Sequence, residues 1–152
     1  DMRSEESPTV DSTDVKAVLL VGELCLEGKT VSKQLGESEA AKRSSRKTVA
    51  DLSINANKKL GLTLPKSHKA MVYVHSGQLE IAGQNIKKNE LAILSSGEEL
   101  EIICQRQKAG CLIMVGEPLN EPVVRGGPFV MNSEAEIQKA FSDYQSGKFG
   151  QV

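Results

Sequence analysis

Few side chains in this sequence suit metal binding or nucleophilic catalysis. Its 152 residues include two histidines, His68 and His75, and three cysteines, Cys25, Cys104 and Cys111. The cysteines show no C-x-x-C spacing and all lie in apolar stretches. We therefore expect buried, reduced thiols rather than a disulfide framework or a zinc site. The histidines are seven residues apart, an odd separation that points them to opposite faces of an extended strand.

The metal-ligand candidates are therefore His68, His75 and Cys104, and each lacks partners nearby in the sequence. Three or more convergent ligands are needed for a typical site. We expect His68 in an exposed loop beside two lysines, and His75 at the end of a strand before the Ser76-Gly77 turn. No metal, cofactor or catalytic residue is predicted for this chain, which we expect not to be an enzyme on its own.

Two carboxylates, Glu117 and Glu121, lie four residues apart and could act as an acid–base pair. Pro118 and Pro122 exclude a helix there, so the alternative is that the carboxylates hold an irregular loop through hydrogen bonds. Asn120 and Asn132 could do the same. Arg125, beside two glycines, is either an anion contact or an exposed loop charge.

Composition excludes several partner classes. The net charge is −1, aromatic residues make up 3% and Trp is absent, which disfavours nucleic-acid or anionic-membrane binding. No apolar stretch reaches membrane-spanning length. A basic cluster, Lys42, Arg43, Arg46 and Lys47, could contact an anion, but acidic neighbours favour a solvated loop. We expect a cytoplasmic protein, or a nuclear one in a eukaryote.

The elements around these residues are predicted to be mostly strands. Residues 1–14 are polar and acidic and indicate a linker or tail, followed by one domain over residues 15–152. Short apolar runs recur about every 8–12 residues with turn signals between them, which indicates an antiparallel sandwich or barrel. These runs cover residues 15–21, 30–35, 49–54, 71–75, 78–82, 91–94, 100–104 and 111–115. The Ser76-Gly77 turn predicts a hairpin between the two runs that flank it.

One helix is predicted, over about residues 133–146. Ser133 and Glu136 form a capping box, and Gly147 has the position of a helix-ending glycine. Between them, apolar residues recur at helical spacing as Ile137, Ala140, Phe141 and Tyr144. This stripe must pack on the same chain or on a neighbouring domain. If Phe141 is buried, its replacement by Ala should cost about 3 kcal/mol or more.

The segment that contains the helix resembles the carboxyl-terminal signature of the pirin family. The matching text is GEPLNEPVVRGGPFVMN, residues 116–132, followed by SEAEIQKAFSDYQSGKFG. Upstream, VKAVLLVGELCLEG and MVYVHSGQLEIAG resemble other parts of the same half. The resemblance implies a cupin, a jelly-roll β-sandwich or barrel, with one carboxyl-terminal helix. Pirins are bicupins of about twice this length, so the chain would be the second half of such a protein or a single-cupin relative.

The resemblance also implies where a metal would bind. Pirins carry iron in the amino-terminal half and are associated with quercetin dioxygenase activity and with transcriptional co-regulation through protein partners. In this chain, the ligand positions of the first cupin motif hold Leu64, Lys66 and Ala70, or Thr63 and Pro65 in a shifted register. The positions of the second motif hold Asn89, Ser95, Gly97, Leu100 and Cys104, with Leu100 at the histidine position.

Three functions remain open from the sequence. The first is a metal-free structural and protein-interaction domain that covers the missing amino-terminal half. The second is a small-molecule-binding or quercetin-dioxygenase-related cupin, acting through a metal-bearing partner half or through a cavity lined by Val72, Val74, Leu79, Ile81 and Leu100. The third is a free-standing cupin that pairs with a second copy of itself. The residues expected to build the interface loop and helix are Glu117, Asn120, Glu121, Arg125, Pro128, Asn132, Ile137, Phe141 and Tyr144.

Overall fold

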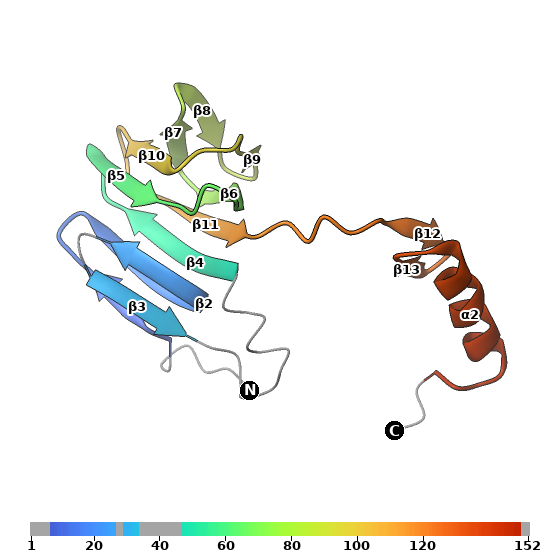
Figure 1. Ribbon diagram of the computed structural model, residues 1–152. Helices are drawn as coiled ribbons and strands as arrows, with labels where there is room; N and C mark the ends of the chain where they lie inside the picture. Colours follow the sequence, from blue (N-terminus) through green and yellow to red (C-terminus); the bar gives the residue numbers. More distant parts are fainter. Residues whose placement is uncertain (1–6, 27–28, 34–46, 150–152) are drawn as a thin grey trace. The chain divides into compact units, whose positions relative to one another are not determined.

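The computed structural model describes residues 7–26, 29–33 and 47–149 (Figure 1). The chain divides into two compact units, Asp1–Pro118 and Leu119–Val152, where the sequence predicted one domain from residue 15 onward. Most of the basic cluster, from Lys42 to Arg46, lies outside the described residues. Across the described residues, no helix combines the length and the apolar character of a membrane span.

The first unit contains two antiparallel sheets. The large sheet has the order β1-β2-β4-β11-β6-β9, with β3 also paired to β2. Its strands are β1 (Thr9–Asp11), β2 (Val15–Leu26), β3 (Lys29–Lys33), β4 (Lys47–Ile54), β6 (Lys69–Ser76), β9 (Leu91–Ile93) and β11 (Ala109–Gly116). The small sheet has the order β5-β10-β7-β8, made of β5 (Lys58–Thr63), β7 (Gln78–Ile81), β8 (Gln84–Lys87) and β10 (Glu99–Cys104).

Aliphatic side chains from both sheets form one core. In β10, Leu100, Ile102 and Cys104 point inward, as the alternation in the sequence predicted. Ile113 of β11 and Leu52 of β4 are fully buried on the inner face of the large sheet. The mainly β sandwich predicted from the spacing of the apolar runs is confirmed.

The polar segment 1–14 is not only a tail. Thr9–Asp11 forms β1, which pairs with Lys16–Val18 of β2, and Val10 is 6% exposed in the core. A short polar strand with one apolar residue gives a weak sequence signal. Pairing with β2 and burial of Val10 stabilise it instead.

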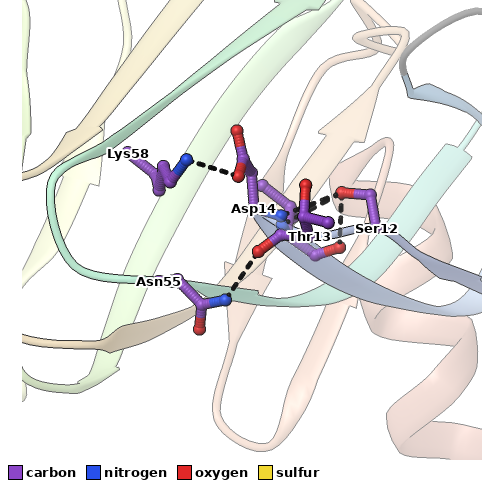
Figure 2. A network of polar contacts seen from close by, with 6 residues as sticks. Ser12, Thr13, Asp14, Asn55 and Lys58 are labelled. Atoms are coloured by element: carbon purple, nitrogen blue, oxygen red, sulfur yellow. Dashed lines mark hydrogen bonds and ion pairs between the residues drawn. The ribbon is translucent and has the colours of Figure 1, made fainter.

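The turn after β1 is held by a polar network (Figure 2). Asn55 Nδ2 donates to the carbonyl of Thr13 at 2.9 Å, and Lys58 pairs with Asp14 at 2.6 Å. The Ser12 hydroxyl oxygen accepts from the backbone N–H groups of Asp14 and Val15. The Lys58 ammonium lowers the pKa of the Asp14 carboxyl. The network ties the entry of β2 to the turn between β4 and β5.

The hairpin predicted at Ser76-Gly77 is wrong. β6 pairs with β11 and β9 in the large sheet, whereas β7 pairs with β10 and β8 in the small one. The chain therefore passes from one sheet to the other at this turn. Gly77 has φ +70, and a Cβ there would lie 2.8 Å from the Cβ of Ala109.

The hairpin at this point of the chain connects β7 and β8 instead. Its two central residues, Ala82 and Gly83, have φ values of 50 and 75, and Ile81 pairs with Gln84. Positive φ at both central residues is the type I′ geometry that matches the twist of paired strands.

The second unit contains β12 (Val124–Gly126), β13 (Phe129–Met131) and α2 (Glu134–Gln145). The Ser133 side chain accepts from the backbone N–H of Glu136 at 3.3 Å, so the predicted N-cap is confirmed. The Glu136 carboxylate accepts from the backbone N–H of Asn132 and from the Ser133 hydroxyl, both at 3.0 Å. At the other end, Gly147 has φ +72 and Lys148 N–H donates to Asp143 O at 2.9 Å, a Schellman ending.

The helix stripe packs on the β12–β13 hairpin of its own unit. Ile137 and Ala140 are 8% and 5% exposed, and Gly126 lies directly against Ile137. Phe141 meets Phe129 edge to face, with ring centroids 5.1 Å apart. Phe141 itself is 37% exposed. The loss of about 3 kcal/mol expected for Phe141→Ala assumed a buried side chain, so it does not apply.

Candidate functional site

The first unit contains a cavity of about 700 Å³ between the turn after β5 and the start of β10. It falls in the ~300–1,000 Å³ range of small-molecule sites. Residues from both sheets and from the loops between them line it, with backbone or side-chain atoms. They are Leu64, His68, Ala70, Glu80, Ile81, Ala82, Gly83, Gln84, Ile86, Leu91, Ala92, Ile93, Leu94, Ser95, Ser96, Gly97, Glu99, Leu100, Glu101 and Ile103.

Three of the four expected ligand positions of the cupin motifs meet at this cavity. Leu64 and Ala70 come from the first motif and Leu100 from the second, and all three line the wall. The fourth, Lys66, is exposed and does not line it. Aliphatic side chains have no lone pairs, so these residues do not fit a metal ion. Among the described residues there is no group of three or more His, Cys, Asp or Glu side chains that could hold one.

Of the remaining positions of the second motif, two line the cavity and two lie elsewhere. Ser95 and Gly97 line the cavity, whereas the Asn89 side chain accepts from the Tyr73 hydroxyl at 3.3 Å. Cys104 is fully buried in the core, and its thiol donates to the carbonyl of Gln107 at 2.9 Å. Burial raises the pKa of the Cys104 thiol, which keeps it protonated and a poor ligand.

The two histidines lie in different surroundings. His68, expected in an exposed loop, is half-buried and lines the cavity. Its backbone N–H donates to Pro65 O at 2.9 Å, and its buried Nδ1 has no hydrogen-bond partner within the described part of the chain. His75 lies near the end of β6, as predicted, and its Nε2 lies 2.9 Å from Asp51 Oδ1. It does not line the cavity.

The apolar lining was only partly predicted. Ile81 and Leu100 line the cavity, but Val72, Val74 and Leu79 are buried in the core and do not. All five side chains face the space between the two sheets. The sequence does not show which part of that space is filled by core side chains and which part is the cavity. Leu64 and Ala70 had a usable signal, because the motif spacing already placed them at ligand positions.

The three thiols were expected to be buried, and one is not. Cys104 and Cys111 are buried, whereas Cys25 of β2 is exposed. Burial, with smaller contributions from the Asp51 carboxylate and Cys104, raises the pKa of Cys111 to about 12. All three are free cysteines. Cys25 is exposed because alternation along β2 directs it outward, between Leu24 and Leu26, which face the core.

The loop residues of the second unit have structural partners. Asn132 Nδ2 donates to Glu121 Oε2 and to Pro122 O, both at 3.0 Å. These bonds join the segment before β12 to the N-terminus of α2. Asn120 has φ 54, in the left-handed region that Asn tolerates. Arg125 and Pro128 are exposed on the hairpin, Tyr144 is exposed on α2, and Glu117 is exposed after β11.

Comparisons with known proteins agree on one family. The model of the pirin C-terminal cupin domain matches residues 49–150. A Vibrio cholerae protein, named provisionally as a quercetin 2,3-dioxygenase, is 41% identical over 102 residues, which cover 67% of this chain and 36% of that protein. Human pirin is 28% identical over 155 residues, covering 99% of this chain and 50% of pirin.

A solved structure gives the same assignment. Quercetin 2,3-dioxygenase from Acinetobacter baumannii superposes with a TM-score of 0.79 at 27% identity, covering 98% of this chain and 49% of that one. The chain thus spans half or less of the length of these relatives. With the family model matching most of its length and the two-sheet fold shared with a solved relative, the chain belongs to the pirin family, as a carboxyl-terminal cupin domain.

Proposed function

We propose that this chain is a metal-free cupin half that acts as a structural and protein-interaction domain of a pirin-like protein. The observation that carries the proposal is the replacement of metal-ligand positions by Leu64, Ala70 and Leu100 around one cavity. Fold-determining residues, such as the caps of α2, are kept in the same chain. A cupin that keeps its fold but not its ligands supports a role in contacts rather than in chemistry.

An exposed apolar face supports the interaction role. On the outer face of the large sheet, Met71 pairs with Ile93, and Tyr73 pairs with Leu91. Met71, Leu91 and Ile93 are 38%, 48% and 77% exposed. We call these four side chains the β6–β9 face. Clustered apolar residues on an edge strand favour a covering partner. The relatives are about twice as long, so the proposed partner is an amino-terminal pirin half.

The test is reassembly from two chains. This chain, tagged, is co-expressed with the amino-terminal half of human pirin, and the complex is isolated and its mass measured by light scattering. We expect a one-to-one complex whose bound metal, measured by mass spectrometry, belongs to the amino-terminal half. Ile93→Lys should prevent copurification, whereas Val123→Lys, at a position 67% exposed in the second unit, should not.

Two results would contradict this proposal. Stoichiometric metal in this chain purified alone would show that it carries its own site. A stable homodimer that excludes the amino-terminal half, and that Ile93→Lys dissociates, would assign the β6–β9 face to a second copy.

The names of the relatives support a second candidate, a contribution to quercetin dioxygenase activity by the reassembled protein. Two of the relatives described above carry that name, the Vibrio cholerae protein and the Acinetobacter baumannii structure. In this function the present chain would stabilise the metal-bearing half and shape its surroundings. Oxygen uptake with quercetin should then require both halves. Uptake by this chain alone, or none by the metal-loaded complex, would contradict the candidate.

A further inference from the structure

The cavity of the first unit has an apolar wall and an acidic rim. Leu64, Ala70, Ile81 and Leu100 supply aliphatic surface that favours an apolar ligand body. Apart from His68, the ionisable residues of the lining are Glu80, Glu99 and Glu101, and no Lys or Arg of the described residues lines the cavity. Such a lining disfavours an anion and favours a cation.

Nearby ammonium groups offset only part of this charge. Lys59 pairs with Glu101, and Lys69 donates to the Ser96 hydroxyl at 2.9 Å from outside the lining. Glu80 accepts a hydrogen bond from the uncharged Gln105 amide, so its charge is not cancelled by that contact. Glu99 is exposed at the start of β10 and lines the cavity.

The backbone beside the cavity adds acceptors. β5 pairs with all of Glu99–Cys104, but β7 pairs with β10 only at Ile102 and Ile103. Among the strands that the structure describes, none therefore pairs with Glu99–Glu101 on the β7 side. In an antiparallel strand, alternate residues direct both their N–H and C=O groups to the same side. At least one carbonyl of this stretch is thus directed to the unpaired side, where an ammonium could donate to it.

His68 is the other polar group suited to a ligand. His68 is a lining residue, and its buried Nδ1 has no hydrogen-bond partner among the described residues. A buried nitrogen without a hydrogen bond is unfavourable. The ring can therefore reorient towards a donor on a ligand without losing a hydrogen bond of Nδ1.

We propose that this cavity binds a small organic cation, an ammonium group attached to an apolar body. The apolar body would contact Leu64, Ala70 and Leu100, and the ammonium would lie at the rim with Glu80, Glu99 and the free edge of β10. This site goes beyond the interaction role, which requires no ligand.

The test uses three ligands with one apolar body and different charges. The full chain is titrated at neutral pH with 2-naphthylmethylamine, 2-naphthylmethanol and 2-naphthoate, and binding is followed by calorimetry and by backbone NMR shifts. The amine should bind up to about fivefold more tightly than the alcohol, the upper end expected for an ion pair with exposed carboxylates. The carboxylate should not bind. Shift changes should concentrate at Ala70, Ala92 and Leu100.

Variants separate the cavity from its charge. Glu80→Gln/Glu99→Gln should abolish the preference for the amine over the alcohol, while Glu134→Gln on α2 should leave it unchanged. Leu100→Phe should fill the cavity and weaken the binding of both the amine and the alcohol. If this variant does not fold, Ala92→Leu is a second variant that fills the cavity. Equal binding of amine and alcohol, or a preference that survives the double variant, would refute the cation class. Absence of binding, or affinity unaffected by filling, would refute the site. Both results are measured on this chain alone, so they are distinguishable from a failure to assemble with the amino-terminal half.

Discussion

The approach of the β12–β13 hairpin to α2 gives a quantitative prediction. A Cβ added at Gly126 would lie 2.4 Å from Ile137 Cγ2 and 3.4 Å from Phe141 Cε2. Gly126 has no positive φ, so the backbone itself would accept alanine. The cost of Gly126→Ala should therefore come from overpacking, which is typically about 1–3 kcal/mol. We expect a loss of about 2 kcal/mol in the free energy of opening α2.

A second substitution locates that cost. Ile137→Leu removes the Cγ2 methyl that the new Cβ would overlap, and alone it should cost less than about 1.5 kcal/mol. In the double variant the alanine methyl occupies the space left by Cγ2. Its total cost should therefore be smaller than the sum of the single costs by about 1–2 kcal/mol, as for other pairs in direct contact.

Native-state hydrogen exchange of the α2 amides is the appropriate assay. It reports the opening free energy of the helix by itself, whatever the stability of the first unit. Gly147→Ala is the control, because its added Cβ would meet nothing within 4 Å among the described residues beyond its chain neighbours, and its cost arises from φ +72. That cost should add to the cost of Ile137→Leu. If Gly126→Ala and Ile137→Leu were also additive within about 0.5 kcal/mol, the packing described here would be wrong.

Three further predictions follow from single contacts. Ser133→Ala should lower the stability of α2 by about 1 kcal/mol, measured by the same exchange experiment, because it removes the N-cap. Cys25 should react with a thiol reagent in the folded chain, and Cys25→Ser should leave the two buried cysteines unreactive until denaturant is added. Lys58 lowers the pKa of the Asp14 carboxyl in the folded state. The ionised Asp14 therefore stabilises the fold fully above the ordinary pKa of 3.8, and this contribution is lost as the pH falls through the lowered pKa. The difference in urea midpoint between wild type and Asp14→Asn should therefore narrow as pH falls from about 5 into that range.

Local signals in the sequence predicted the local structures. Ser133, Glu136 and Gly147 mark both ends of α2 through hydrogen bonds within a few residues, and all were confirmed. The alternation of Leu100, Ile102 and Cys104 likewise identified the inward face of β10, because successive side chains of a strand point to opposite faces.

Pairing between distant segments was not predictable in this way. A glycine with positive φ, such as Gly77, suits either a hairpin or a passage between sheets, and the turn residues alone do not distinguish them. β1 was missed because its stability depends on β2. For a similar reason, the sequence predicted some residues of the cavity lining but not the opening of the cavity. Motif spacing located Leu64, Ala70 and Leu100, but the opening beside them depends on β7 ending at Ile81, which is a property of the assembled sheet.

The place of β11 in the large sheet has a consequence for how the chain is made. β11 lies between β4 and β6, yet it is the last strand of that sheet to leave the ribosome. Until residues 109–116 emerge, β4 and β6 each expose an unpaired edge, and the sheet cannot close around its core. Such late, non-local pairing slows folding and leaves edges open to other chains. The large sheet should therefore stay open to chaperones and to other chains until residues 109–116 have emerged.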